Sequence, residues 1–565
     1  MTDRNKDMLV YLASGKSTQQ TVCVSKYAWS SHAIMLENGD HLECWLAGQI
    51  SSLSDLAELV SSRSTAEINL FLRREQRAFG VIIRFDDYLF AACDRVQSYP
   101  IFWEQCGDDL VVSSDPRYFR SEHYKGRLRT ELLTLFKASG YSLGSDTMVQ
   151  GVKRVRPGES IMHEGAGTVV SERYYLYMPE LSRNVEAPET LRDELGNVID
   201  EIVTSLISDA DGRPIVLPLS AGFDSRLLLG KLVEHGADNL ITFSYGTLGN
   251  MEAGEAKKFA EQVGVPWFFV APDKSDVEEY KRGELREYLR FSGGIHTTSA
   301  VTEYFALKKM AEKGYVGDHV LYINGQSGDF LTGGHLFIEP DIDAYLDRIM
   351  AKHFGLLALD ADSPIRKEFK KVLLGWASEN DIAEADQEEF LPHRFHLLFE
   401  WQERQSTYVI NQQRAYDWFG IQWSLPLWHP KLMDFYERVP LEYQIEQKLY
   451  LDYLRHWNFK GLFDSMRMPY DPWPNFKLPI LLAGHLTGRF VGEAKKSEFY
   501  KKLSYFSDQH YLYRLFPRKL FFKHSREVRN AATFFMLDNL VSLKQDLGGT
   551  VEAGIETDLR DYLHS

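Results

Sequence analysis

Cysteine is scarce in this chain, with four among 565 residues. Cys23, Cys44, Cys93 and Cys106 all lie in the first fifth of the sequence, and no two of them form a CxxC pair. Structural zinc sites and disulfide frameworks depend on closely spaced or numerous cysteines. The sequence therefore indicates neither, and a reducing compartment such as the cytoplasm fits it best.

An excess of positive charge and long apolar runs are also missing. The chain has 64 Lys and Arg against 80 Asp and Glu, a formal net charge of −16. Nucleic-acid binding relies on many Lys and Arg contacts to phosphates, so we expect no nucleic-acid partner. There is no run of about 18 apolar residues that could span a bilayer, and the N-terminal segment lacks the basic region and apolar core of a secretion signal. We therefore expect a cytoplasmic protein.

The pattern of the sequence changes near residue 180. Residues 8 to about 178 contain short apolar or alternating runs, such as VIIRF and YLFAA, which are typical of an antiparallel, strand-rich domain. From about residue 190, strand runs such as PIVLPL alternate with helical patterns, which favours a parallel sheet with helices on both faces. We expect a first domain over 1–178, a linker over 179–190, a second domain over 190–470 and a helical extension over 471–565.

A short turn in the second domain has an unusual composition. The strand expected over 214–219 is followed by Ser220, Gly222, Asp224 and Ser225, and then by leucines at helical spacing. A helix N-terminus presents unpaired N–H groups and the positive end of the helix dipole, which together suit a phosphate. The turn therefore predicts a pyrophosphate site. In a purely structural interpretation, the serines cap the helix and the aspartate interacts with its dipole.

Two further turns are expected at the same edge of the sheet, where open α/β sheets bind their ligands. One follows the strand LITF and offers backbone groups for a purine base. The other follows HVLYIN, is rich in glycine and contains a single acid, Asp329. Asp224 and Asp329 are then the two carboxylates that suit Mg²⁺ beside phosphate oxygens. The predicted nucleotide-binding residues are Leu219, Ser220, Gly222, Asp224, Ser225, Ser244, Tyr245, Gly246, Gly325 and Gly328.

The order of these motifs resembles that of the asparagine synthetase family. LSAGFDS resembles the pyrophosphate loop of N-type ATP pyrophosphatases, GQSGDFLTGG resembles the later glycine-rich loop, and QKLYLDYLR places Lys448 on the family's functional lysine. DRVQSYPIFW and GVKRVRPGES resemble segments of the glutaminase half. The resemblance implies an α+β, Ntn-hydrolase-like domain followed by an α/β, adenine nucleotide α-hydrolase-like domain. It also implies ATP and Mg²⁺, with Lys448, Asp224 and Asp329 as catalytic residues.

The chain departs from the family pattern at several positions. Thr2 stands where a family glutaminase exposes its cysteine, and LAGQI at 46–50 lacks the family's Asn-Gly pair. The resemblance therefore implies a degenerate glutaminase domain. Gln326 stands where relatives carry Glu or Tyr, and glutamine cannot act as a general base. His429 replaces the aspartate of the family's R-x-P-F-L-D segment.

The resemblance implies a ligase that adenylates a small-molecule, sugar or peptide carboxylate and transfers ammonia or an amine to it. Three alternatives stay open. The first is amidation with free or partner-delivered ammonia, for instance of a sugar uronate in surface polysaccharide biosynthesis. The second is amide formation with an amine of the substrate, as in β-lactam synthetases and lasso-peptide cyclases. The third is an inactive scaffold, against which the intact motif residues weigh. The oligomeric state is left open.

Other features of the sequence are ambiguous. His296 and His335 are equally compatible with facing the substrate and with structural positions. Between residues 494 and 529, Lys and Arg outnumber the acids and alternate with aromatic residues. Such a segment suits peripheral contact with an anionic membrane surface. The alternative is a helical core of aromatics with a solvated charged rim.

Overall fold

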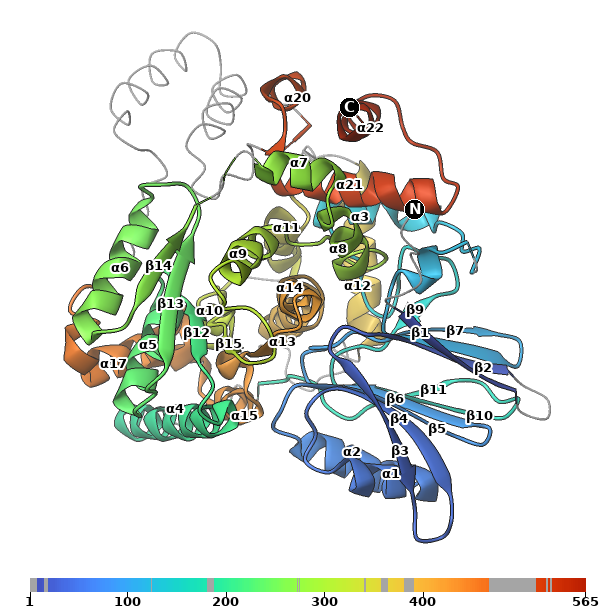
Figure 1. Ribbon diagram of the computed structural model, residues 1–565, viewed down its shortest axis with the longest axis horizontal. Coiled ribbons are helices and arrows are strands. Elements are labelled where there is room, and N and C mark those ends of the chain that lie inside the picture. The colour runs from blue at the N-terminus through green and yellow to red at the C-terminus, as the bar shows by residue number, and fades with distance from the viewer. Residues whose placement is uncertain are drawn as a thin grey trace.

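The computed structural model describes every residue except 1–7, 15–18, 123, 180–186, 272, 274, 340–341, 357–363, 381–390, 467–514, 525–526, 529–530 and 565. The N-terminal part contains two stacked sheets, with strand orders β1-β2-β8-β7-β9 and β11-β10-β6-β5-β4-β3 (Figure 1). The strands are β1 (Met8–Ser14), β2 (Gln19–Ser25), β3 (Trp29–Met35), β4 (His41–Gly48), β5 (Phe79–Phe85), β6 (Tyr88–Cys93), β7 (Phe102–Cys106), β8 (Asp109–Ser113), β9 (Lys153–Arg154), β10 (Glu159–Glu164) and β11 (Val170–Arg173).

The predicted antiparallel, strand-rich domain is confirmed in its layout, with one parallel pair of strands as an exception. β2 and β8 run parallel, with Gln20 opposite Leu110, whereas the other pairs of described strands in these sheets are antiparallel. Parallel neighbours need a long crossover, and here the whole stretch from β3 to β7 lies between the two strands. Short-range patterns in the sequence do not reveal such a pairing.

The two sheets stack because several strands are apolar on both faces. In β5, Val81 and Ile83 point to the main core beneath helices α1 (Leu53–Ser62) and α2 (Thr65–Arg74). Ile82, on the opposite face, belongs to a separate apolar layer with Trp45 of β4. Since successive side chains of a strand alternate between faces, a continuous apolar run places β5 between two buried layers.

The second domain is built on a parallel sheet of order β14-β13-β12-β15-β16. Its strands are β12 (Ile215–Pro218), β13 (Leu240–Tyr245), β14 (Trp267–Val270), β15 (Leu321–Ile323) and β16 (Gln422–Ser424). Helices α5 (Phe223–Glu234) and α6 (Met251–Val263) lie on one side of this sheet, and α9 (Thr302–Ala311) and α14 (Arg414–Trp418) lie on the other (Figure 1). A sheet domain rich in antiparallel pairs followed by a parallel-sheet domain confirms the layout expected from the sequence.

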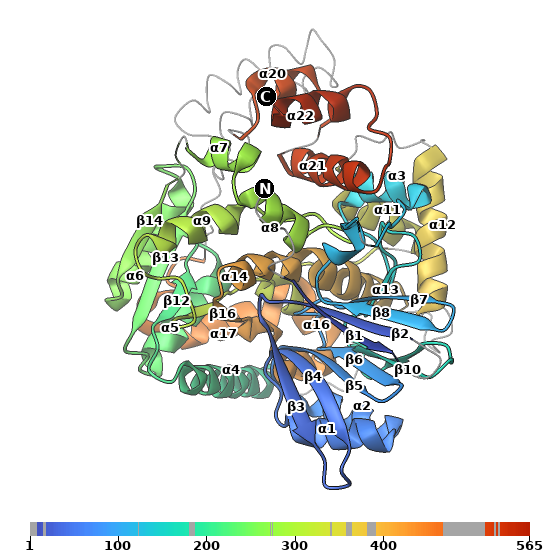
Figure 2. The same cartoon turned by 45° about the vertical axis from the view of Figure 1, so that its right-hand side comes forward.

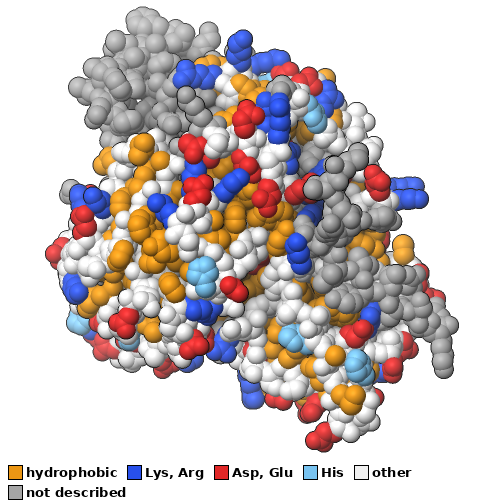
Figure 3. Space-filling view, viewed as in Figure 1, with side chains coloured by type: hydrophobic (Ala, Val, Ile, Leu, Met, Phe, Trp, Pro, Cys, Tyr) orange, Lys and Arg blue, Asp and Glu red, His pale blue; other side chains and the backbone are white. Residues whose placement is uncertain are grey.

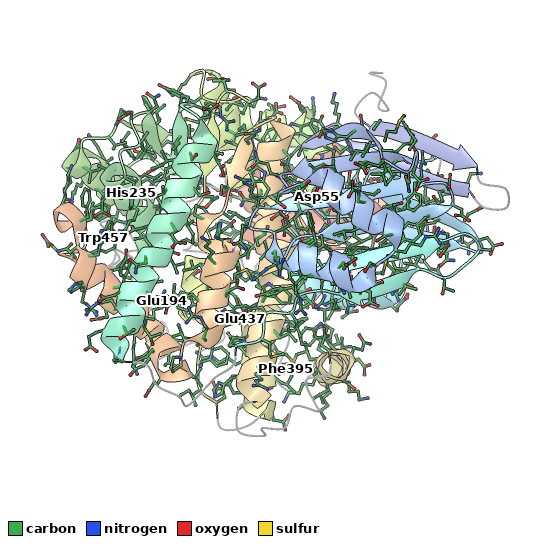
Figure 4. All side chains as sticks on the ribbon, turned by 90° about the horizontal axis from the view of Figure 1, so that it is seen from below. Asp55, Glu194, His235, Phe395, Glu437 and Trp457 are labelled. Carbon is green, nitrogen blue, oxygen red and sulfur yellow. The ribbon has the colours of Figure 1, made fainter. Side chains whose placement is uncertain are left out.

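Helix α4 (Pro188–Ala210) and helix α15 (Pro430–Arg438) run side by side along the lower edge of the molecule, with Glu194 on the first and Glu437 on the second (Figure 4). The further helices are α3 (Leu133–Ser139), α7 (Ser275–Arg282), α8 (Leu285–Ser292), α10 (Gly328–Leu331), α11 (Ile342–His353), α12 (Pro364–Glu379), α16 (Leu441–Gln444), α17 (Lys448–Trp457), α20 (Arg518–Lys523), α21 (Ala531–Asp546) and α22 (Ile555–His564). Short 3₁₀ turns lie at Tyr118–Arg120, Thr130–Leu132, Pro426–Trp428, Ile445–Gln447 and Phe459–Gly461.

One helical run lies between the two halves of the molecule. Helix α13 (Leu391–Phe399) continues into a π-helix (Glu400–Val409), a 3₁₀ turn (Ile410–Gln413) and then α14. Both ribbon views place α13 and α14 between the parallel sheet and the N-terminal sheets (Figures 1 and 2). This run therefore contacts both domains.

The C-terminal helices do not belong to the second domain alone. Asp546 of α21 accepts hydrogen bonds from Arg120 of the first domain, at 2.9 Å, and from Arg290 of α8, at 2.8 Å. Most of the basic and aromatic segment 494–529 lies outside the described residues, and with it most of the predicted membrane contact. In its described part, Phe516 and Phe521 are buried, as expected for helical core. Among the described helices, none combines the length and the apolar character needed to cross a bilayer.

Candidate functional site

Three strand ends of the parallel sheet meet at one edge. β13, β12 and β15 are neighbours, so the loops that follow them open on the same side of the sheet. The N–H of Leu219 donates to the carbonyl of Phe243 at 2.8 Å, and the hydroxyl of Ser244 donates to the carbonyl of Leu219 at 2.6 Å. These bonds hold the first two strand ends together and place the predicted pyrophosphate turn at the edge.

The two serines of this turn bond within the turn. The N–H of Ser220 donates to the hydroxyl of Ser225 at 3.1 Å, and the N–H of Gly222 donates to the hydroxyl of Ser220 at 3.1 Å. Helix α5 begins after Gly222 and has no side-chain cap. The interpretation of the serines as helix caps is therefore wrong, because their hydroxyls shape the loop instead. The helix N-terminus keeps the character of an anion site.

The two predicted carboxylates come together. The N–H of Asp329 donates to Oδ2 of Asp224 at 3.0 Å, and the hydroxyl of Tyr450 donates to Oδ1 of Asp224 at 2.9 Å. Burial, together with the negative charge of Asp329, raises the pKa of Asp224 to about 7. Two carboxylates that repel each other at the mouth of a phosphate loop fit a divalent cation with oxygen ligands, because the cation compensates both charges.

His335 links Asp329 to a buried acid. Its Nε2 lies 3.0 Å from Oδ2 of Asp329, and its Nδ1 lies 2.8 Å from Oε1 of Glu400. Although burial opposes it, hydrogen bonds to Asp329 and Glu400 raise the pKa of His335 to about 9. His335 is therefore part of the site, beside Asp329, whereas the sequence alone left its position open.

Two glycines of the glycine-rich loop lie very close to the loop that contains Asp224. A Cβ on Gly328 would lie 2.7 Å from Oδ1 of Asp224, and one on Gly325 would lie 3.0 Å from the N of Ser225. Ser327 adopts a left-handed conformation with φ of 66°. Strained residues of this kind persist where the surrounding structure holds them, often at functional sites. The two loops can contact each other only because glycines occupy these positions.

The predicted adenine-binding residues lie partly inside the strand. Ser244 pairs with Phe269 and Tyr245 with Val270, so β13 extends two residues beyond the predicted LITF. The hydroxyl of Ser244 also accepts from Nε1 of Trp267 at 3.0 Å. The prediction that Ser244 and Tyr245 form the turn is therefore wrong, because pairing with β14 continues. Gly246, with φ of 132°, is where the turn begins.

Lys448 is exposed at the first position of α17. Glu446 and Gln447 immediately before it both have φ of 57°, an uncommon pair of left-handed residues. The side chain of Gln447 donates to Thr332, within the glycine-rich segment GQSGDFLTGG, at 2.6 Å. Because Tyr450, two residues later, reaches Asp224, the start of α17 lies beside the two carboxylates.

Two of the departures from the family pattern, Gln326 and His429, and the ambiguous His296 have structural explanations. Gln326 exchanges amide hydrogen bonds with Gln412, at 3.1 Å, and with Gln413, at 2.6 Å. His429 precedes α15, and its Nδ1 accepts from the N–H of Lys431, so the imidazole caps that helix as an aspartate would. His296 is 2% exposed and packs against a phenylalanine, which makes it a core residue.

Three residues that contact the site were not predicted from the sequence. Tyr450 reaches Asp224, Glu400 reaches His335, and Gln405 accepts from the hydroxyl of Ser327 at 2.6 Å. Tyr450 lies in the quoted QKLYLDYLR segment, two positions after Lys448, so its proximity to the predicted lysine is a usable signal. Glu400 and Gln405 lie in a segment without a recognised motif.

Apolar side chains border this edge of the sheet. Figure 3 shows hydrophobic side chains gathered over the parallel-sheet half of the face that it presents. Leu248 and Met251, after β13, and Ile338, after α10, are among the exposed large apolar residues, at 75%, 48% and 64% exposure. Their segments follow the loops of the site, so they offer apolar contact to an organic substrate.

A cavity lies between the two domains, and none of its described lining residues is a cysteine. The cavity has a volume of about 680 Å³ and is lined by Gly48 and Gln49 of the LAGQI segment and by Asp94. Burial raises the pKa of the Cys44 thiol to about 12, and Cys23 and Cys93 are likewise buried with raised pKa values.

We expect no hydrolysis of glutamine by this protein, because a protonated, buried thiol is a poor nucleophile. The measurement is glutamate release from glutamine, with and without ATP. Cys106→Ala serves as a control, since this exposed thiol lies outside the cavity lining. Release above background that disappears when one cysteine is replaced would contradict the prediction and identify the nucleophile.

Comparison with known proteins gives one family. Residues 197–458 match the family model described as asparagine synthase. No curated protein matches the chain. A solved structure of glutamine phosphoribosylpyrophosphate (PRPP) amidotransferase from B. subtilis, complexed with ADP and GMP, is 13% identical, covers 58% of this chain and 72% of that chain, and has a TM-score of 0.19. Another solved structure, described as the allosteric regulatory enzyme of purine biosynthesis, is 13% identical and has a TM-score of 0.17. The match covers 53% of this chain and 58% of that chain. TM-scores this low do not establish a shared fold. The description of the fold is based on the strand orders given above.

Proposed function

We propose that this chain, whose residues 197–458 match the asparagine synthase family, is an ATP-dependent amidating ligase that activates a carboxylate as its adenylate and converts it to an amide. The observation that carries this proposal is the contact between two loops: the N–H of Asp329 donates to Asp224 at 3.0 Å, beside the open N-terminus of α5. Carboxylates and an anion site side by side are what the binding of ATP with a divalent cation requires.

The reaction divides into two displacements. A carboxylate oxygen of the substrate attacks the α-phosphorus of ATP, and the bond to pyrophosphate breaks. The nitrogen of ammonia or an amine then attacks the acyl carbon, AMP leaves, and one proton is released. Mg²⁺ held by Asp224 and Asp329 would neutralise charge on the phosphates. The turn at 220–225 binds and orients the leaving pyrophosphate, and Lys448 supplies fixed positive charge at the reacting edge.

We propose that the nitrogen comes from free or partner-delivered ammonia or from an amine on the substrate. This part of the proposal is supported by the burial of Cys23, Cys44 and Cys93 and by the lack of a cysteine among the described residues that line the cavity. A sugar uronate is one candidate for the acid. The apolar residues Leu248, Met251 and Ile338 favour a substrate that also presents a hydrocarbon surface.

The test is pyrophosphate release from ATP and ammonium with a panel of acids that includes uronates, peptides and amino acids. Amide and AMP should form in equal amounts with one class of acid. A substrate that cyclises without added ammonium would favour the intramolecular alternative. If ATP–pyrophosphate exchange appears with no acid of the panel, and no AMP is formed, the proposed function is wrong.

Lys448→Ala should lower the rate of amide formation by about a hundredfold, because fixed positive charge at the transition state is lost. The KM for ATP should change much less, since the phosphate turn and both carboxylates stay in place. Steady-state kinetics on the best acid of the panel measures both quantities. Lys460→Ala, an exposed lysine beyond the end of α17, is the matched control and should behave like the wild type. A large rise in the KM for ATP alone would contradict a role for Lys448 in the chemical step.

A further inference from the structure

A long π-helix lies between the two domains. The segment Glu400–Val409 forms it in the middle of the helical run 391–418. π-helices are rare, mostly single turns, and they often occur at functional sites. Most of the buried side chains of this one are polar, and buried polar groups need hydrogen-bond partners. The buried residues are Glu400, Trp401, Gln402, Glu403, Gln405, Ser406 and Thr407.

One side of the π-helix holds the glycine-rich loop 325–334, called the metal loop here because its Asp329 is proposed to bind Mg²⁺. Glu400 binds Nδ1 of His335 at 2.8 Å, and Gln405 accepts from the hydroxyl of Ser327 at 2.6 Å. The amide of Gln405 also donates to Glu400 at 3.1 Å. Ser327 and His335 flank Asp329 in the sequence. The π-helix therefore holds the loop before and after its metal-binding carboxylate.

The π geometry is necessary for this arrangement. In an α-helix, with 3.6 residues per turn, side chains five positions apart point about 140° away from each other. In a π-helix the hydrogen bonds run from residue i to residue i+5, so such side chains share a face. Glu400 and Gln405 are five positions apart and bond to each other, which brings both of them to the metal loop.

Further contacts of the π-helix come from helices α11 and α12 and from the N-terminal domain. Nε2 of His353 in α11 lies 2.6 Å from Glu400, and Nε1 of Trp376 in α12 donates to Glu403 at 2.7 Å. Glu403 accepts from the N–H of Gly144 at 3.0 Å and from Nη2 of Arg154 at 3.0 Å. The side chains of Arg154 and Glu403 are both 0% exposed. Nη1 of Arg154 donates to Gln97 at 2.8 Å, and Nε1 of Trp401 donates to the carbonyl of Arg95 at 3.1 Å. A fully buried ion pair therefore joins the first domain to the segment that holds the metal loop.

We propose that Arg154 and Glu403 are positioning residues for the metal site, so that the degenerate domain takes part in the reaction through structure instead of glutamine hydrolysis. This inference rests on the proposed function of the two carboxylates. The pair determines the position of the π-helix, Glu400 and Gln405 transmit that position to His335 and Ser327, and Asp329 is thereby held opposite Asp224. Partners behind metal ligands typically change metal affinity by about 10- to 100-fold when they are removed.

The test compares two double variants. Arg154→Met with Glu403→Gln removes the ion pair without leaving one charge buried alone. Arg120→Met with Asp546→Asn removes another ion pair, between the first domain and α21, with side chains 3% and 15% exposed. The further hydrogen bonds of this control pair go to Ser542 of α21 and to Arg290 of α8. Mn²⁺ binding in the presence of α,β-methylene-ATP, measured by electron paramagnetic resonance, reports on the metal site without turnover.

We expect the Mn²⁺ dissociation constant to rise at least about tenfold in the Arg154 and Glu403 variant, and to stay at the wild-type value in the control. Both variants should keep the wild-type circular dichroism spectrum. Equal weakening in the two variants, or wild-type affinity in the first, would overturn the proposal.

Gln405→Met provides a second test if the first variant does not fold. It breaks the link to Ser327 on the metal side and leaves the ion pair intact, so it should also weaken Mn²⁺ binding about tenfold. Wild-type affinity in this variant would overturn the proposal as well. A wild-type protein that binds Mn²⁺ with the nucleotide but activates no acid would contradict the proposed function alone, since the comparison of affinities would still stand.

Discussion

Replacing Asp224 or Asp329 by asparagine should lower the rate of ATP–pyrophosphate exchange by about a hundredfold or more. Each substitution removes a negative charge that faces the proposed site for the phosphates and the metal, and charges of this kind stabilise the transition state strongly. A hundredfold loss corresponds to about 2.7 kcal/mol in the activation free energy. Asparagine keeps the size of the side chain, so the effect reports on charge.

The assay follows labelled pyrophosphate into ATP with the best acid of the panel. Asp238→Asn is the matched control, because this exposed aspartate precedes β13 at the opposite edge of the sheet. It should exchange pyrophosphate at the wild-type rate. If Asp329→Asn also exchanged at that rate, the glycine-rich loop would be an ordinary turn and the metal assignment would be wrong.

Gly328→Ala should reduce exchange to a similar or greater extent, although it adds only one methyl group. Its Cβ would lie 2.5 Å from Cδ1 of Leu427 and 2.7 Å from Oδ1 of Asp224, and real Cβ atoms do not approach other atoms so closely. The loop must therefore move away from Asp224. A displacement of about 1 Å at a reacting centre can cost about a hundredfold in rate.

Gly254→Ala is the control for this substitution. Gly254 lies inside α6, and an added Cβ there would have no neighbour within 4 Å. Alanine is favoured over glycine in a helix interior by roughly 0.5–1 kcal/mol, so the melting temperature should stay the same or rise. Activity should match the wild type. Wild-type exchange in Gly328→Ala would show that the two loops need not touch during the reaction.

The parts of the site that can be predicted from the sequence are those that a short, continuous sequence pattern identifies. An apolar strand, a turn of small polar residues and a leucine-rich helix identify the loop at Asp224, and a second strand followed by glycines identifies the loop at Asp329. Because both strands are parallel neighbours, their ends meet without further information. The pairing of Ser244 and Tyr245 with β14 could not be read in this way, since it depends on a strand about 25 residues later.

Contacts between distant segments account for the rest. Tyr450 bonds Asp224 from 226 residues away, and Glu400 bonds His335 from 65 residues away. The π-helix that presents Glu400 has no periodic apolar pattern to reveal it, because its buried side chains are mostly polar. Such contacts depend on the tertiary fold, so they can be identified only in the folded structure.

The aromatic residues at the boundary between the domains join their two cores. Tyr27 stacks on Trp418 with ring centroids 4.7 Å apart, Tyr99 lies 5.3 Å from Trp423, and Tyr175 lies 6.0 Å from Trp401. Deleting the first domain would expose these tryptophans to water and leave Glu403 without Arg154. The second domain should therefore depend on the first for its own folding, whatever chemistry the first domain performs.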